Sequence, residues 1–131
     1  TMVVDGEIDE GIIWEAMMFA NKYELDNYII ILDNNGLQLD GTCNQIMPHI
    51  DLSVKAAAFG FDVYDIDGHD MEQIRDTFYK IREAQNGKPK FINAKTIKGK
   101  GVDFMENQLG WHGVAPNDEQ YADAMVQLER G

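Results

Sequence analysis

Two hydrophobic patterns alternate along the chain, and their order predicts the fold. Four stretches are short and largely apolar, as β-strands are: residues 1–4, 28–32, 61–66 and 91–96. The unbroken, β-branched run at 28–32 is typical of a strand buried on both faces of a parallel sheet. Four other stretches have the spacing of helices: residues 8–23, 52–59, 71–84 and about 117–128. This β-α-β-α-β-α-β-α order predicts an α/β fold with a doubly wound parallel sheet.

Residues that commonly begin or end helices support these boundaries. Gly60 follows the second predicted helix, and Asn86-Gly87 follows the third. Asp70 stands where it would cap the third helix at its amino end. Asp9 and Glu10 would lie in the first turn of the first helix, where carboxylates favour the positive end of the helix dipole.

Three polar or glycine-rich segments directly follow predicted strands, at residues 5–7, 33–41 and 98–112. Ligands of such sheets bind at the carboxyl ends of the strands, so all three segments are expected on one ligand-binding edge. Each segment alone has a simpler explanation, because Asp, Asn and Gly are also ordinary turn residues. Residues 99–101 are too short for a phosphate-binding P-loop. The coincidence of all three segments is what indicates a site.

Composition narrows the classes of function. A chain of 131 residues is long enough for one hydrophobic core, so residues 1–131 are expected to form a single domain. The 11 basic and 23 acidic residues give a net charge of −12, which argues against binding nucleic acid. No apolar run is long enough to span a membrane, and no signal peptide is recognisable, so a cytoplasmic location is expected. The single cysteine, Cys43, is interpreted as a small apolar side chain, since no neighbouring histidine suggests a nucleophile.

The polar segments contain motifs that resemble one enzyme family. Asp5-Gly6-Glu7, with Asn35 following 30 residues after Asp5 (35 − 5), resembles the thiamine diphosphate motif that begins Gly-Asp-Gly and ends in Asn. Further segments resemble the transketolase family and occur in family order: residues 7–11, 14–16, 25–27, 33–41, 67–70, 95–101, 111–113 and 115–118. The resemblance covers essentially the whole chain. It implies part of a thiamine-diphosphate-binding domain, and a transferase that moves a two-carbon ketol unit between sugar phosphates in the pentose phosphate pathway.

The resemblance implies a magnesium site and a cofactor site. Asp5, the side chain of Asn35 and the carbonyl of Leu37 would bind Mg²⁺, which prefers oxygen ligands and also takes them from phosphate. A helix beginning near Ile8 would add backbone N–H donors for the diphosphate.

Other positions would contact the cofactor or the substrate. Gly6 and Glu7 would lie near the diphosphate, and Leu39 would pack near the cofactor. His112 matches a family histidine near the diphosphate and the substrate, so it is a predicted catalytic residue.

Two carboxylates match an acidic network between the active sites of a dimer. One of them, Glu10, is a second predicted catalytic residue, and the other is Glu15. Simpler interpretations remain for both, namely compensation of the helix dipole for Glu10 and a solvated helix position for Glu15. His49 and His69 are interpreted as structural.

Two departures from the family pattern bear on function. Val4 stands where the family motif begins with glycine, which would be unfavourable for cofactor binding if that position needed a positive φ or a close approach to a ligand. The chain also covers only part of the family's diphosphate-binding domain, and the pyrimidine-binding domain lies outside it. We therefore expect inactivity of this chain alone, and association into a homo- or hetero-oligomer that completes the enzyme.

Two other functions remain open at this point. The chain could be a non-catalytic fragment or degenerate paralogue that acts only in folding and association, as Val4 suggests. It could also belong to another thiamine enzyme, such as a deoxyxylulose phosphate synthase or a dehydrogenase component. Residues 33–41 and 111–113 argue against the second of these.

Overall fold

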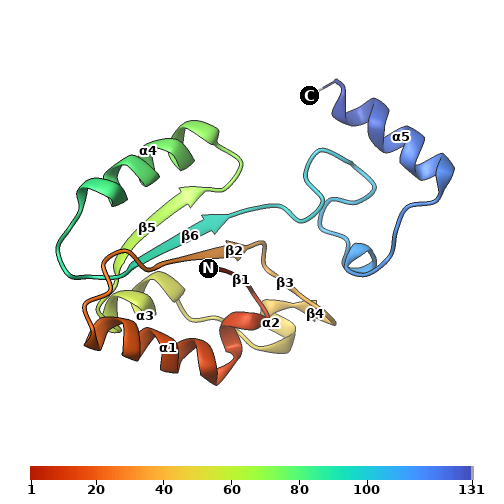
Figure 1. Ribbon diagram of the computed structural model, residues 1–131. Coiled ribbons are helices and arrows are strands. Elements are labelled where there is room, and N and C mark those ends of the chain that lie inside the picture. Colours follow the sequence, from red (N-terminus) through yellow and green to blue (C-terminus); the bar gives the residue numbers. More distant parts are fainter. Residues whose placement is uncertain (131) are drawn as a thin grey trace.

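A four-stranded parallel sheet forms the centre of the protein (Figure 1). The computed structural model describes residues 1–130. The sheet consists of β1 (Met2–Val4), β2 (Ile29–Asn34), β6 (Lys90–Lys95) and β5 (Asp62–Asp67), in that spatial order, and every neighbouring pair is parallel. All four strands expected from the apolar runs are present. The prediction of an α/β fold with a parallel sheet is confirmed.

The helices cover both faces of the sheet, as the strand order requires. The chain steps from β1 to β2 and then to β5 in one direction, and returns from β5 to β6 in the other. Right-handed crossovers then place the first two connecting helices on one face and the third on the opposite face. Figure 1 shows α1 (Gly11–Lys22) and α3 (Leu52–Ala58) together below the sheet, and α4 (Met71–Glu83) above it.

Alternate side chains of the strands divide the core between these two layers. On one face Ile30 and Leu32 of β2 belong to a buried cluster that includes Met17 of α1 and Ala56 of α3. On the other face the neighbouring residues of β2 pack with the buried Ile81 of α4. A strand buried on both faces reads as a continuous apolar run, which explains the pattern at residues 28–32.

Three short elements were not predicted from the sequence. A hairpin of β3 (Leu37–Gln38) and β4 (Gly41–Thr42) follows β2, and the four-residue helix α2 (Cys43–Ile46) follows the hairpin. Two-residue strands are too short to show an alternating pattern. Thr42 precedes this helix, and both its backbone N–H and its hydroxyl donate hydrogen bonds to the side-chain oxygen of Gln45, at 3.1 and 2.9 Å.

The first predicted helix is divided in two. A single turn of 3₁₀-helix covers Glu7–Asp9, Glu10 is extended at φ −73° and ψ 131°, and α1 begins only at Gly11. The prediction that Asp9 and Glu10 lie in the first turn of this helix is therefore wrong, and so is its predicted start near Ile8. The apolar spacing continues through the 3₁₀ turn, so periodicity alone could not reveal one extended residue.

The carboxyl-terminal part of the chain leaves the sheet. After β6 a long loop with a 3₁₀ turn at Leu109–Trp111 leads to α5 (Asp118–Leu128), which lies beyond the carboxyl ends of the strands (Figure 1).

The predicted cap of α4 is present. Asp70 accepts hydrogen bonds from the backbone N–H groups of Glu72 and Gln73. None of the helices in residues 1–130 is both long and apolar enough to cross a membrane.

Candidate functional site

The carboxyl ends of β1, β2 and β6 lie side by side and bring the three polar segments together. In the sheet register Val4 is beside Asp33, and Asp33 is beside Ala94. The strands therefore end nearly level, and the segment after each begins at the same edge. This confirms that the three segments share one edge of the sheet.

Asp5 is the buried anchor of this edge. It follows β1 directly, and its side chain has no exposed surface. Its Oδ2 accepts hydrogen bonds from the backbone N–H groups of Asn35 and Gly36, both at 2.8 Å. Burial raises the pKa of Asp5, although the two backbone hydrogen bonds act against this. The Asp5 carboxylate thus holds the turn after β2 in place, although burial makes its charged form less favourable.

The turn that Asp5 holds is also linked to β6. The side-chain oxygen of Asn35 accepts from the N–H of Leu37 at 3.0 Å, and its amide nitrogen donates to Asp33 at 3.3 Å. Asp33 in turn accepts a short hydrogen bond from the hydroxyl of Thr96. These contacts define the positions of Asn35 and Leu37 relative to two strands.

A cleft of about 580 Å³ opens above these strand ends. Its walls come from the segments after β1, β2, β5 and β6. The predicted site residues that line it are Gly6, Glu7, Glu10, Asn35, Leu37, Leu39 and His112. Asp5 lies behind this wall, and Glu15 is exposed on α1. The structure therefore gathers the predicted cofactor and catalytic residues around one cavity, with Asp5 beneath it.

The loop after β6 brings a basic group to the cleft beside His112. Lys98 Nζ lies 3.4 Å from His112 Nδ1. The loop closes on itself, because the N–H of Asn107 donates to the carbonyl of Lys98 at 2.9 Å. Gly99 has φ +74°, and an added Cβ would lie 2.6 Å from the carbonyl oxygen of Met105. A glycine is therefore required where the loop turns back.

Val4 lines the cleft and has the ordinary backbone conformation of a strand. It is the last residue of β1, and Glu24 and Asn107 are the non-glycine residues with positive φ in the described part of the chain. The expected backbone strain at Val4 is therefore absent, and a β-branched residue suits a strand. The N–H of Val4 donates to Glu7 Oε2 at 2.9 Å, which holds the Glu7 carboxylate beside the strand end.

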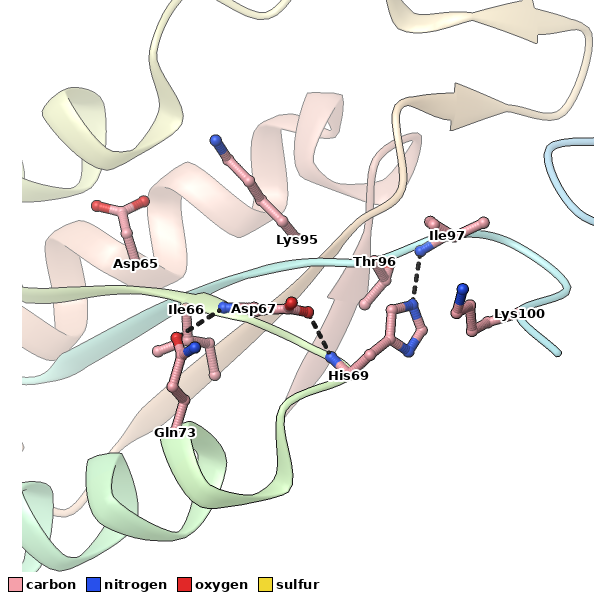
Figure 2. Close-up of a pocket in the computed structure, with 9 residues that line it drawn as sticks. All are labelled: Asp65, Ile66, Asp67, His69, Gln73, Lys95, Thr96, Ile97 and Lys100. Carbon is pink, nitrogen blue, oxygen red and sulfur yellow. Dashed lines mark hydrogen bonds between the residues drawn. The ribbon is translucent and has the colours of Figure 1, made fainter. Parts of the chain in front are cut away.

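A second hollow, of about 520 Å³, adjoins the cleft at the ends of β5 and β6 (Figure 2). His69 separates the two cavities and contributes to both. The ring Nε2 of His69 accepts a hydrogen bond from the backbone N–H of Ile97 at 2.8 Å (Figure 2). The backbone N–H of His69 donates to the Asp67 carboxylate at 2.9 Å. The imidazole ties the segment after β5 to the segment after β6, which agrees with a structural role.

Sequence reasoning missed a group of side chains behind Asp5. His49 lies between two carboxylates, with Nδ1 3.5 Å from Asp5 Oδ1 and Nε2 3.1 Å from Asp9 Oδ1. Gln38 Nε2 donates to Asp9 Oδ2 at 2.8 Å. Cys43 also lies here, so the thiol does have a histidine neighbour, contrary to the expectation. No sequence spacing indicates this group, because the unpredicted hairpin folds residues 43–49 back onto β1.

Comparison with known proteins assigns the fold and this edge to a family. The family model described as "Transketolase, thiamine diphosphate binding domain" matches residues 1–129, which include every residue of the cleft. The chain belongs to the transketolase family.

Curated relatives in the transketolase family include proteins that are named as subunits. The chain is 42% identical over 130 residues to "6-deoxy-6-sulfo-D-fructose transketolase subunit SqwG" of Clostridium sp. (strain MSTE9), covering 99% of this chain and 47% of that protein. It is 43% identical over 124 residues to one subunit of the apulose-4-phosphate transketolase of Phocaeicola vulgatus, covering 95% of this chain and 44% of that protein. The chain thus spans less than half the length of these relatives.

Solved structures confirm the transketolase fold. The transketolase of Campylobacter jejuni superposes with a TM-score of 0.90 at 31% identity, over 98% of this chain and 20% of that one. The transketolase mutant H261F of Pichia stipitis superposes with a TM-score of 0.88 over 98% of this chain and 19% of that one. At 21% identity, the second comparison supports the fold alone.

Proposed function

We propose that this chain holds the diphosphate end of thiamine diphosphate, together with Mg²⁺, in a transketolase that transfers a two-carbon ketol unit between sugar phosphates. The observation that carries the proposal is the cleft at the ends of β1, β2 and β6. It gathers seven residues chosen for the cofactor or for catalysis on sequence grounds: Gly6, Glu7, Glu10, Asn35, Leu37, Leu39 and His112.

The oxygen donors of the turn fit a hard cation. Asp5 is a fully buried carboxylate directly beside this turn, because its Oδ2 accepts hydrogen bonds from the backbone N–H groups of Asn35 and Gly36. Asn35 and Leu37 belong to the turn that Asp5 itself holds. A carboxylate, an amide oxygen and a main-chain carbonyl are the ligand types that Mg²⁺ takes from proteins. We therefore propose Asp5, Asn35 and Leu37 as its ligands.

The remaining cleft residues would bind and orient the cofactor and substrate. Gly6 leaves open space where a side chain would begin, since an added Cβ would meet no atom within 4 Å. Leu39, which is 63% exposed, would gain an apolar contact if the cofactor packed against it. Bound thiamine diphosphate supplies the carbon nucleophile for ketol transfer, and the protein orients it. His112, whose Nδ1 lies 3.4 Å from Lys98 Nζ, would hold or move a proton near an anionic substrate.

The proposal includes a partner that completes the enzyme. Two relatives are named as transketolase subunits, and this chain covers less than half of each. We propose that the chain works in a homo- or hetero-oligomer that contains the remaining part of the diphosphate-binding domain and a pyrimidine-binding domain or subunit. The two relatives are named for different sugars at similar identity to this chain, so only the class of sugar substrate is proposed.

Reconstituted activity tests the proposed function. The protein, assembled with the remaining part of the diphosphate-binding domain and with the pyrimidine-binding half, should transfer a two-carbon unit from a ketose phosphate to an aldose phosphate, with release of the shortened aldose. His112→Asn should lower kcat by about 100-fold or more if the imidazole transfers a proton. Glu83→Gln, at an exposed position of α4, is the matched control. An assembled protein that binds the cofactor but transfers no unit would support the non-catalytic alternative instead.

A further inference from the structure

Three side chains of different chemistry converge behind the cleft: Asp5, Cys43 and His49. They come from the end of β1, the first turn of α2 and the segment after α2. One carboxylate oxygen, the sulfur and one ring nitrogen all lie within 4.8 Å of one another. Asp5 and Cys43 are buried, and the His49 side chain is only 11% exposed. No element of the proposed magnesium site requires Cys43 or His49.

The Asp5 carboxylate presents an unsatisfied atom to this group. Its Oδ2 accepts two backbone hydrogen bonds, whereas its Oδ1 has no hydrogen-bond partner among residues 1–130. A buried polar atom left in this state costs about 1–3 kcal/mol. The nearest ring nitrogen, His49 Nδ1, lies 3.5 Å from Oδ1. A cation between the two atoms would satisfy the free oxygen.

Asp9 orients the histidine for such a role. His49 Nε2 lies 3.1 Å from Asp9 Oδ1, so the ring N–H on Nε2 is placed to donate to that carboxylate. In this tautomer Nδ1 carries a lone pair, which faces the Asp5 oxygen. Metal-binding histidines commonly donate their other ring N–H to a carboxylate, which fixes the ring and strengthens the ligand.

The spacing suits a tetrahedral ion. Metal–ligand bonds of about 2.0–2.3 Å at tetrahedral angles separate ligand atoms by about 3.3–3.8 Å. The Oδ1–Nδ1 distance of 3.5 Å lies within this range. The Cys43 sulfur lies within 4.8 Å of the other two ligand atoms. A small movement of its side chain would therefore bring all three atoms to metal-binding distances. The sulfur and nitrogen ligands exclude Mg²⁺, which prefers oxygen, and favour a softer transition-metal ion.

We propose that Asp5, Cys43 and His49 bind a divalent transition-metal ion of the Zn²⁺ class, with water as the fourth ligand. Binding would replace the proton of the Cys43 thiol with a metal–sulfur bond and release that proton to solvent. If Asp5 also serves Mg²⁺, which rests on the proposed function, the two cations would compete for its carboxylate. Zn²⁺ would then oppose loading of the Mg²⁺–diphosphate pair.

Cobalt spectroscopy tests the site without any cofactor. Co²⁺ would be titrated into the purified, reduced and metal-free protein, followed by Zn²⁺. We expect a near-ultraviolet thiolate-to-cobalt absorption band that saturates at one equivalent and disappears when Zn²⁺ is added. Cys43 is the only cysteine in the sequence, so the band reports on this thiol alone. Circular dichroism on each sample establishes that the protein is folded.

Two histidine variants make the test specific. Losing a residue that only supports a metal ligand typically weakens metal binding about 10- to 100-fold. His49→Gln removes a ligand itself, so it should weaken Zn²⁺ binding by more than this. His69→Gln, which alters a histidine outside the group, should leave Zn²⁺ affinity unchanged. A folded protein without the thiolate band would overturn the proposal, and so would equal Zn²⁺ affinity of the two variants. Neither result would bear on thiamine diphosphate binding, which is measured separately.

Discussion

At the scale of single residues, Asp5 combines a structural and a functional role. Its buried carboxylate holds the turn after β2 through two backbone hydrogen bonds, and its second oxygen is left without a hydrogen-bond partner in the described chain. Burial raises the pKa of Asp5, which means that the charged form is disfavoured in the folded protein. A buried charge of this kind is explained if a cation binds it.

This arrangement predicts opposite effects of Asp5→Asn on stability and on binding. Since the pKa of Asp5 is raised on folding, its stabilising contribution is complete below the unfolded pKa of about 4 and is lost as pH rises through the folded pKa. The metal-free variant should therefore be more stable than the parent near neutral pH, with no gain in acid. Mg²⁺ with thiamine diphosphate should stabilise only the parent.

Thermal unfolding across a pH series, with and without the two ligands, measures these effects. Equal stability of parent and variant at every pH would show that the Asp5 charge is not disfavoured by folding. Equal stabilisation of both proteins by Mg²⁺ and cofactor would remove Asp5 from the proposed metal site.

At the scale of elements, the loop after β6 depends on one glycine. Gly99 has φ +74°, and an added Cβ would lie 2.6 Å from backbone atoms of the same loop. Gly99→Ala should destabilise the protein by about 1–3 kcal/mol, the typical cost of a strained residue. It should also lower activity, because the loop carries Lys98 and His112. Gly110→Ala provides the matched control, since its Cβ would meet no atom within 4 Å.

Denaturant unfolding and turnover of the assembled enzyme would measure both glycine variants. The expected result is a loss for Gly99→Ala in each measurement, with little change for Gly110→Ala. Similar behaviour of the two variants would contradict the proposed dependence of the loop on Gly99.

The amino end of β6 depends on a buried lysine and its partners. Lys90 has no exposed surface, and its Nζ donates to Asp62 at 2.9 Å and to Asn86 at 2.7 Å. Burial acts to raise the pKa of Asp62, but hydrogen bonds from Asn86 and Lys90 and the charge of Lys90 outweigh it, and the net shift is downward. The resulting stability is present above the unfolded pKa of about 4 and is lost as pH falls through the folded pKa.

Removing the carboxylate should therefore leave a buried cation unpaired. Asp62→Asn should cost about 3 kcal/mol, the lower end of the range for a broken buried pair, because Asp62 is partly exposed. Adding Lys90→Met should recover much of this loss, since it removes the unpaired charge. Denaturant unfolding at pH 7 measures both variants. If the double variant were as unstable as the single one, the buried charge would not be the cause.

The elements show which parts of the structure the sequence can predict. The four strands and four principal helices were expected because each is long enough to show its period of apolar residues. The hairpin and α2 were not, because two-residue strands show no period. The extended Glu10 was also missed, because one residue does not interrupt the apolar spacing of its neighbours.

The same limit applies to the site. Residues 5–7 and 33–41 could be placed on one edge because parallel strands end together. The group around Asp5 could not be predicted, since His49 lies 44 residues away (49 − 5) and reaches it through the unpredicted hairpin. Lys90 was missed for a similar reason, because its partner Asp62 lies on another strand.

At the scale of the whole molecule, both layers of helices serve to hold one edge of the sheet. The cores on the two faces fix β2 and β6, and the segments after these strands line the cleft. A rigid sheet with polar segments at its carboxyl edge is well suited to hold an anionic cofactor. The chain covers less than half of each of two curated relatives that are named as subunits. We therefore propose that the complete enzyme includes both a further part of the diphosphate-binding domain and a pyrimidine-binding half.

Binding of thiamine diphosphate tests the central claim most directly. The purified protein, assembled with the remaining part of the diphosphate-binding domain and with the pyrimidine-binding half, would be titrated with thiamine diphosphate by calorimetry, with and without Mg²⁺. We predict binding that requires Mg²⁺ and is lost in Asp5→Asn and in Asn35→Ala, but is kept in Glu83→Gln. Absence of binding by a folded assembly, or binding that neither Asp5→Asn nor Asn35→Ala weakens, would contradict the proposed role of this edge.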